Sequence, residues 1–115
     1  MGYCRGNFQP HHIFFNPDDF TVKLSGSDFT HDISQTQKVV PTVFSPYLSP
    51  ELVYSKEGCV PSPEVDVWGI GCTLAQFLMG GVPPFSKASM SNADYLKMLI
   101  ETVGIWLSYY SFFCR

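Results

Sequence analysis

The stretch that decides the fold runs from Tyr47 to Phe85 and reads YLSPELVYSKEGCVPSPEVDVWGIGCTLAQFLMGGVPPF. It contains Ser-Pro-Glu twice, at 49–51 and 62–64. Serine can cap a helix, proline suits the first helical turn, and glutamate is favoured at the positive end of the helix dipole. The first copy therefore predicts a short helix, and the second predicts a longer helix over about 63–79. Gly80 and the glycine after it favour the left-handed backbone that ends helices.

Apolar side chains occupy every face of the predicted 63–79 helix rather than a single stripe. A helix that is hydrophobic all round is normally buried inside a larger core. We therefore expect this helix to be central and buried, with other segments packed around it. The apolar positions are Val65, Val67, Trp68, Ile70, Cys72, Leu74, Ala75, Phe77, Leu78 and Met79.

A further helix is predicted over about 92–103. Ser91, with Asp94 three residues later, forms a partial capping box. The apolar residues that follow fall on one face, which predicts an amphipathic helix on the outside of the domain. These residues are Tyr95, Leu96, Leu99, Ile100 and Val103.

The N-terminal half predicts a small hairpin followed by a long loop. The β-type runs Ile13–Phe15 and Thr21–Leu24 are separated by Asn, Pro and Asp residues, which favour turns. Residues 25–46 are rich in Ser, Thr, Asp and Gln and have no sustained period, which predicts a long mobile loop. The predicted fold class is mainly α with a small β-hairpin.

Composition limits the classes of partner and the location. The chain has 115 residues, a net charge of −3 and no Lys/Arg cluster, which argues against a nucleic-acid surface. Its four cysteines lack zinc-site spacing, so we expect reduced thiols. The N-terminus has no signal-peptide pattern, and the uncharged run 105–114 is too short to span a bilayer. We predict a cytoplasmic or nuclear location, without membrane contact.

Three signatures then point to a family. Tyr47-Leu48-Ser49-Pro50-Glu51 resembles the Ala-Pro-Glu motif that closes a kinase activation segment, and residues 66–72 (DVWGIGC) resemble the DxWxxG start of the central lower-lobe helix. Residues 81–85 (GVPPF) are similar to the G-x-x-P-F that follows that helix. Residues 5–104 therefore resemble part of the lower lobe of a serine/threonine-type eukaryotic protein kinase. The resemblance implies a truncated C-lobe without the upper lobe, and residues 105–115 form an unrelated hydrophobic tail.

The resemblance implies a structural role for Asp66. In the family, the matching aspartate accepts hydrogen bonds from the catalytic-loop backbone. The alternative is that Asp66 only interacts favourably with the helix dipole. The other structural motif positions carried over from the family are Ser49, Pro50, Glu51, Trp68 and Gly71. Glu51 lacks its arginine partner in this sequence, and burial would leave it as an unpaired charge.

The catalytic-loop remnant, residues 5–15, departs from the family pattern at its reactive positions. Residues 9–15 align with the K-P-x-N-I-L-L part of the family motif, which places Asn7 at the catalytic Asp position. A kinase needs that carboxylate to orient and accept the proton of the substrate hydroxyl. Gln9 replaces the lysine that contacts the transferred phosphoryl group, and His12 replaces the metal-binding asparagine. Imidazole is a poor substitute for an oxygen ligand to Mg²⁺.

In the activation-segment-like loop, residues 25–51, the metal-binding Asp-Phe-Gly motif of the family can be aligned in two ways. A gapless alignment gives Gly26-Ser27-Asp28 and loses the metal carboxylate, whereas a two-residue insertion gives Asp28-Phe29-Thr30 and keeps it. Asp28 is thus the one candidate metal ligand. Phe44 stands where these kinases place a threonine that bonds to the catalytic aspartate. The candidate phosphorylation sites are Ser34, Thr36 and Thr42.

These observations lead to three expectations for function. The first is a catalytically inactive, pseudokinase-like fragment that binds an unknown protein through the 92–103 helix and the 105–114 tail. The second is an incomplete piece of a serine/threonine kinase that transfers phosphate from ATP to protein hydroxyls. The third is a non-functional truncated product. No cofactor is expected for the chain itself, and ATP and Mg²⁺ are expected only if a longer form supplies an upper lobe.

Overall fold

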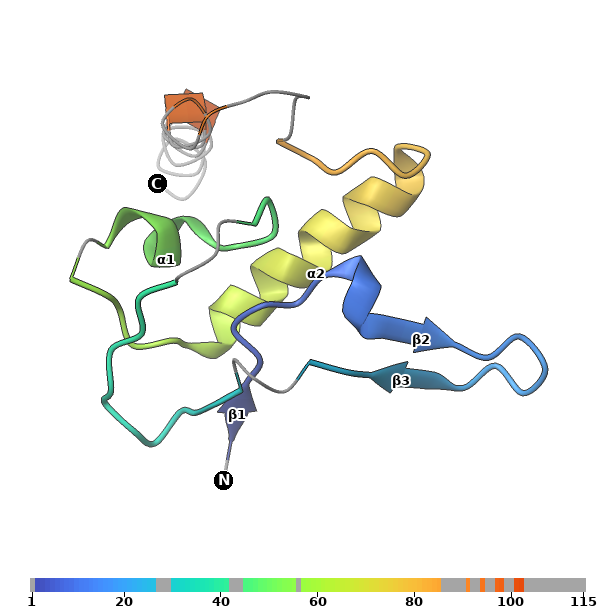
Figure 1. The fold of residues 1–115 in the computed structure, drawn as a ribbon, viewed down its shortest axis with the longest axis horizontal. Helices are drawn as coiled ribbons and strands as arrows, with labels where there is room; N and C mark the ends of the chain where they lie inside the picture. The colour runs from blue at the N-terminus through green and yellow to red at the C-terminus, as the bar shows by residue number, and fades with distance from the viewer. Residues whose placement is uncertain are drawn as a thin grey trace, which may run out of the picture. The chain divides into compact units, whose positions relative to one another are not determined.

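The computed structural model describes residues 2–26, 30–41, 45–55 and 57–85, together with residues 91, 94, 97, 98, 101 and 102. The chain divides into two compact units, Met1–Pro84 and Phe85–Arg115, and each is considered by itself. Among its described residues the first unit has two α-helices, one 3₁₀ turn and four short strands. Figure 1 labels both α-helices and the first three strands.

The helix α2 (Pro63–Leu78) is the longest element and follows the predicted boundaries closely. Its N-cap residue Ser62 is extended and proline occupies the first turn, but the Ser62 side chain does not make the capping bond that the sequence suggests. At the other end the Met79 amide donates to the Ala75 carbonyl, and Gly80 has a φ of 71°. That left-handed backbone favours glycine and ends the helix.

The short helix α1 (Pro50–Tyr54) begins after Ser49, as predicted. Ser49 again makes no side-chain capping bond, and its hydroxyl is buried without a hydrogen-bond partner among the described residues. Leu52 of α1 packs with Leu48 and with Val65 of α2 in a small core cluster. This cluster joins the two helices.

The predicted hairpin is present as β2 (Ile13–Phe15) and β3 (Val22–Leu24), which pair antiparallel (Figure 1). The 3₁₀ turn η1 (Pro10–His12) leads directly into β2. Between the strands, the Asp18 amide donates to Asn16 Oδ1 and the Thr21 amide donates to Asp19 Oδ1. These side-chain bonds to the backbone explain why Asn and Asp residues turn the chain here.

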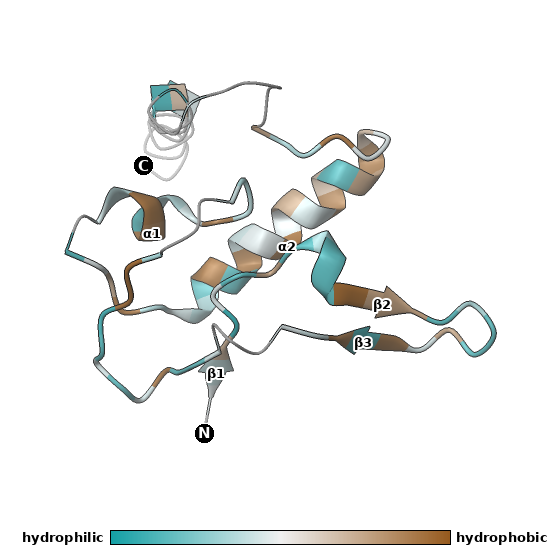
Figure 2. Cartoon of the chain, in the orientation of Figure 1, coloured by the Kyte–Doolittle hydropathy of each residue, from teal (hydrophilic) through white to brown (hydrophobic). Residues whose placement is uncertain are grey.

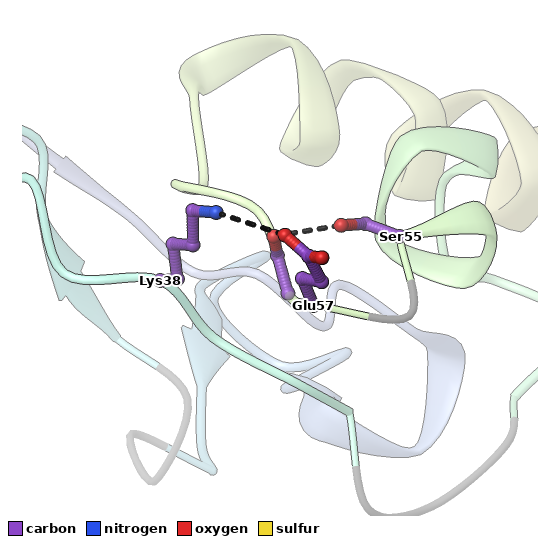
Figure 3. A network of polar contacts seen from close by, with 4 residues as sticks. Lys38, Ser55 and Glu57 are labelled. Atoms are coloured by element: carbon purple, nitrogen blue, oxygen red, sulfur yellow. Dashed lines mark hydrogen bonds and ion pairs between the residues drawn. The ribbon is translucent and has the colours of Figure 1, made fainter.

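The predicted 25–46 loop contains two pairings that the sequence did not indicate. The strand β4 (His31–Asp32) pairs antiparallel with β1 (Tyr3–Cys4), and Val39 forms an isolated bridge with Cys59. Near that bridge Lys38 Nζ lies 3.9 Å from Glu57 Oε2, and Ser55 Oγ donates to the Gly58 carbonyl (Figure 3). The described part of this loop is therefore fixed to other segments at two points.

One prediction about α2 is wrong, because the helix is not buried on every face. Val65, Gly69, Cys72 and Thr73 are buried, whereas a second set of residues faces solvent. Figure 2 shows hydrophobic residues along the whole helix. The described segments of the first unit cover only one side of it. The exposed apolar residues are Val67, Ile70, Leu74, Phe77, Leu78 and Met79.

The second unit is described at seven positions, of which 94, 97, 98, 101 and 102 are helical. The Asp94 amide donates to Ser91 Oγ at 3.2 Å, which is the N-terminal capping bond that the sequence predicts. The tail 105–115 lies outside the described residues. In the ranges that are described, no helix has the length and apolar character needed to cross a bilayer.

Candidate functional site

The loop at residues 5–9 is held by Asp66 in the first turn of α2. The Arg5 amide donates to Asp66 Oδ2 at 2.6 Å, and the Gly6 amide donates to Asp66 Oδ1 at 2.9 Å. One carboxylate thus accepts two backbone bonds from a segment sixty residues earlier in the chain. These are the bonds that the resemblance implies, and bonds to a charged acceptor are worth about 1.5–3 kcal/mol each.

A glycine lets the same loop approach the helix closely. A Cβ placed on Gly69 would lie 2.7 Å from the Phe8 carbonyl oxygen and 2.8 Å from Phe8 Cβ. Gly71, the glycine of the DxWxxG pattern, is exposed, and a Cβ there would meet nothing within 4 Å. Close packing therefore requires glycine at 69 rather than at 71, a distinction that the sequence motif alone did not make.

Asn7 follows directly after the two anchored residues. Its side-chain oxygen Oδ1 is shielded from solvent and has no hydrogen-bond partner among the described residues. Asn7 also lines a cavity of about 20 Å³, together with Gly6, Val39, Pro41, Leu48, Leu52 and Pro61. A space of this size holds about one water molecule.

Gln9 and His12 bond to each other instead of lining an open site. The Gln9 amide nitrogen Nε2 lies 3.0 Å from His12 Nε2, and since an amide nitrogen only donates, the imidazole nitrogen accepts. Gln9 is buried, and its Oε1 accepts a bond of 3.3 Å from Ser45 Oγ. The side chains of Gln9 and His12 are therefore engaged within the protein.

Ser45 is a contact residue that the sequence analysis missed. Its hydroxyl donates to Gln9 and accepts from the Tyr47 amide, while the Tyr47 hydroxyl donates to Gln76 Oε1 of α2. The sequence predicted that Phe44, one residue earlier, had lost a bond between this segment and the catalytic loop. Phe44 lies outside the described residues, but the neighbouring Ser45 links the two segments. The sequence did contain a signal for this contact, because Ser45 carries a hydroxyl one residue after the position that aligns with the family threonine.

Several of the remaining predicted site residues lie outside the described part of the chain. Asp28 and Phe29, the candidate metal-binding motif, lie outside the described residues, as does Thr42. Just before them, the Arg5 guanidinium donates to the Gly26 carbonyl at 3.2 Å. A Cβ on Gly26 would lie 2.6 Å from the His12 ring, so this segment passes close to the loop. The role of Asp28 as a metal ligand stays a prediction.

The described family-reactive positions lack a carboxylate. Mg²⁺ prefers oxygen ligands, and the position of the family's metal-binding asparagine offers an imidazole nitrogen at His12 instead. Within the described ranges, no group of three or more His, Cys, Asp or Glu residues is placed to hold a metal ion. We therefore derive no catalytic step through these groups.

Glu51 and the two described candidate phosphorylation sites are exposed. Glu51 faces solvent in α1, so the cost of an unpaired buried carboxylate does not arise. Ser34 Oγ donates to Asp32 Oδ1 at 2.7 Å, and the Ser34 amide donates to the same oxygen. These two bonds hold the pKa of Asp32 below its usual value. Thr36 is exposed in the same loop.

Two cysteine thiols of the first unit are buried. Cys4 in β1 and Cys72 in α2 are free and buried, and Cys59 is free and half-buried. Burial raises the pKa of Cys72 to about 11, and burial together with the charge of Asp66 raises the pKa of Cys4. Both thiols therefore stay protonated at neutral pH, which suits packing rather than reactivity.

Comparison with known proteins finds relatives that are serine/threonine protein kinases. Serine/threonine-protein kinase ENV7 of Saccharomyces cerevisiae is 31% identical over 112 residues, which cover 89% of this chain and 30% of the relative. The chain is similar to serine/threonine protein kinases. RIM11/MSD1 of the same yeast is 26% identical over 102 residues (88% of this chain, 26% of the relative), and chk-2 of Caenorhabditis elegans is 30% identical over 88 residues (76% and 18%).

This kinase-like relationship is distant and covers a part of each relative. No family model matches the chain. The chain spans 30% or less of the length of the three relatives. What the whole relatives do is therefore not transferred directly to this chain.

Proposed function

We propose that this chain is a catalytically inactive, kinase-like fragment that acts by binding a protein. The observation that carries the proposal is Asn7, which directly follows the pair of residues anchored by Asp66. A neutral amide cannot accept a proton from a substrate hydroxyl at physiological pH, whereas a kinase requires a carboxylate there.

The neighbouring side chains support the same proposal. Gln9 is bonded to His12 and Ser45, so its amide is used to join the loop to the segment that precedes α1. A lysine at this position would supply a mobile positive charge for a phosphoryl group, but a buried glutamine supplies none. The positions that would handle phosphate in the family therefore have structural partners here. No cofactor is expected for this chain.

The partner is proposed to be a protein that contacts apolar surface. The sequence favours the 92–103 helix and the 105–114 tail as contact surfaces, and the exposed apolar residues of α2 add a third. Nucleic acid and membrane are not expected partners, since the chain has no basic cluster. The proposed location is the cytoplasm or nucleus.

A phosphoryl-transfer assay tests the proposal. The purified chain is incubated with Mg²⁺, γ-labelled ATP and a mixture of Ser/Thr peptides, and label transfer is compared with that of two variants. Asn7→Ala removes the residue at the catalytic position, and Asn16→Ala removes an exposed asparagine in the hairpin turn. We expect all three proteins to remain at the level of the blank. Label transfer that Asn7→Ala abolishes and Asn16→Ala preserves would refute the proposal.

A second candidate is that the chain is part of a serine/threonine kinase with an upper lobe encoded elsewhere. The bonds from Arg5 and Gly6 to Asp66 favour it, because they keep the loop in place for chemistry. Sequencing of the native transcript distinguishes the two candidates. An upstream G-x-G-x-x-G loop and a strand lysine would favour the kinase. Asn7 would still limit its rate severely.

A further inference from the structure

The outer edge of β2 is an unpaired apolar strand edge. In antiparallel pairs, hydrogen-bonded and non-hydrogen-bonded residue pairs alternate. The Asn16 amide donates to the Thr21 carbonyl, and the Ser25 amide donates to the His12 carbonyl. The register then makes Phe14 and Lys23 the hydrogen-bonded pair inside the hairpin. The backbone N–H and C=O groups of Ile13 and Phe15 therefore point away from β3.

These outward groups lie between exposed apolar side chains. Phe14 is 58% exposed and Phe15 is 57% exposed. Among the described residues, β2 pairs only with β3. A two-stranded hairpin is marginally stable in water, and an apolar edge with free backbone groups readily pairs with another strand.

We propose that the β2 edges of two copies of this chain pair antiparallel about a two-fold axis through Phe14. Ile13 of each copy then forms a hydrogen-bonded pair with Phe15 of the other, and the two Phe14 residues form the non-hydrogen-bonded pair between them. The result is a four-stranded sheet with β3 at both outer edges. The contact is the same patch on both copies, so it closes as a dimer and does not propagate.

Side-chain pairing favours the β2 edge over the β3 edge. In non-hydrogen-bonded pairs the side chains are closest, and aromatic pairs there are stabilising. Two-fold pairing of β2 places Phe14 against Phe14. The same arrangement of β3 would place Lys23 against Lys23, and like charges directly opposite are destabilising. A lysine on an edge strand also discourages pairing in general.

The ends of the paired strands are complementary as well. In this register the turn after β2 lies beside the η1 turn that precedes β2 in the other copy. The first turn carries the exposed carboxylates Asp18 and Asp19, and the second carries His11 and His12. Each carboxylate turn therefore lies beside a turn that carries no carboxylate and exposes His11, and two carboxylate turns never face each other.

A contact of three residues per copy is small. Stable interfaces bury roughly 1,600 Å², and a strand edge of this length buries much less. We therefore expect weak, concentration-dependent association that a covalent trap captures more reliably than gel filtration does.

The first test is disulfide trapping with Phe14→Cys in the full chain. Paired thiols at a non-hydrogen-bonded position across the two-fold axis meet the short Cβ separation that a disulfide needs. The matched control is Lys23→Cys, the cross-strand neighbour of Phe14 on the same face of the hairpin. We expect mild oxidation to give a dimer joined through position 14, identified by peptide mapping, and little dimer joined through position 23. Equal trapping at both positions would overturn the proposal.

The second test uses proline to remove one outward N–H from either edge. Phe15→Pro removes it from the β2 edge, and Val22→Pro removes it from the β3 edge at the directly opposite residue. By symmetry, Phe15→Pro deletes two bonds between copies, so we expect trapping through position 14 to fall by about 30-fold. Val22→Pro should leave it within about twofold. An unchanged yield with Phe15→Pro, or a chain that stays monomeric and binds only unrelated extended peptides, would contradict a homodimer. Neither result depends on whether the chain transfers phosphate.

Discussion

The two faces of α2 differ sharply although the sequence is apolar on both. One face carries Asp66, Gly69 and Cys72 and contacts the loop at residues 5–9. The opposite face exposes Val67, Leu74 and Leu78, of which Leu78 is 89% exposed. The comparison shows that the contacts of this helix are decided by a few specific side chains, because hydrophobicity alone does not distinguish its faces.

The largest expected effect is at Asp66. Asp66→Ala removes the acceptor of two charge-assisted bonds and leaves the Arg5 and Gly6 amides unsatisfied, so we expect a loss of about 3–5 kcal/mol in unfolding free energy. Glu64→Ala is the matched control, because Glu64 is an exposed acid in the same first turn. It should cost only about 0.3–1 kcal/mol, the value of a helix-dipole interaction. Urea denaturation gives both values, and equal losses would show that Asp66 acts through the dipole alone.

The next effect concerns the Cys72 thiol on the buried face. With a pKa raised from 9.0 to about 11, the thiol has about 100-fold less thiolate at pH 8 than an exposed cysteine. We expect iodoacetamide to modify Cys72 at least that much more slowly in native protein than in urea, as read by peptide mass spectrometry. The raised pKa also means that this thiol contributes stability below about pH 9 that is lost as pH rises toward 11. Rapid native modification would show that this face opens.

Two glycines in α2, buried Gly69 and exposed Gly71, test the difference between the two faces of the helix. Gly69→Ala forces a methyl group against the Phe8 carbonyl, and we expect a loss of about 1–3 kcal/mol. Gly71→Ala points into open space and should gain about 0.5–1 kcal/mol, because alanine is the better helix former. Thermal unfolding of the two variants decides the matter. The reverse order would place the loop on the other side of the helix.

The smallest expected effect is between two valines of the same helix. Val65 is 3% exposed and Val67 is 67% exposed. Val65→Ala should lose about 1–2 kcal/mol through lost burial, whereas Val67→Ala should change the unfolding free energy by less than about 0.5 kcal/mol. Urea denaturation under the same conditions measures both. A large loss at Val67 would mean that a partner or another copy covers the exposed face.

Local patterns predicted the regular elements well. The Ser-Pro-Glu repeats gave the start of both helices, and the Asn, Pro and Asp cluster gave the hairpin turn. The capping bonds of Ser49 and Ser62 were expected on the same grounds and are not made. Residue preference at a helix start reflects backbone geometry as well as the capping bond.

Contacts between distant segments were harder to predict. The pairings of β1 with β4 and of Val39 with Cys59 involve one or two residues each, too short for an alternating pattern to be recognised. The bond between Ser45 and Gln9 needed a known three-dimensional relation between two loops. The Asp66 bonds were predictable only because the family resemblance supplied that relation. The exposure of one face of α2 could not be read from its composition.

The helix α2 holds the loop at residues 5–9, which carries Asn7 and Gln9, through Asp66. Residue-resolved amide hydrogen exchange of Arg5 and Gly6 tests it most directly. We predict that both amides are protected in the native chain, that Asp66→Ala removes the protection, and that Glu64→Ala preserves it. Exchange of the two native amides as fast as in the urea-unfolded chain would contradict the claim.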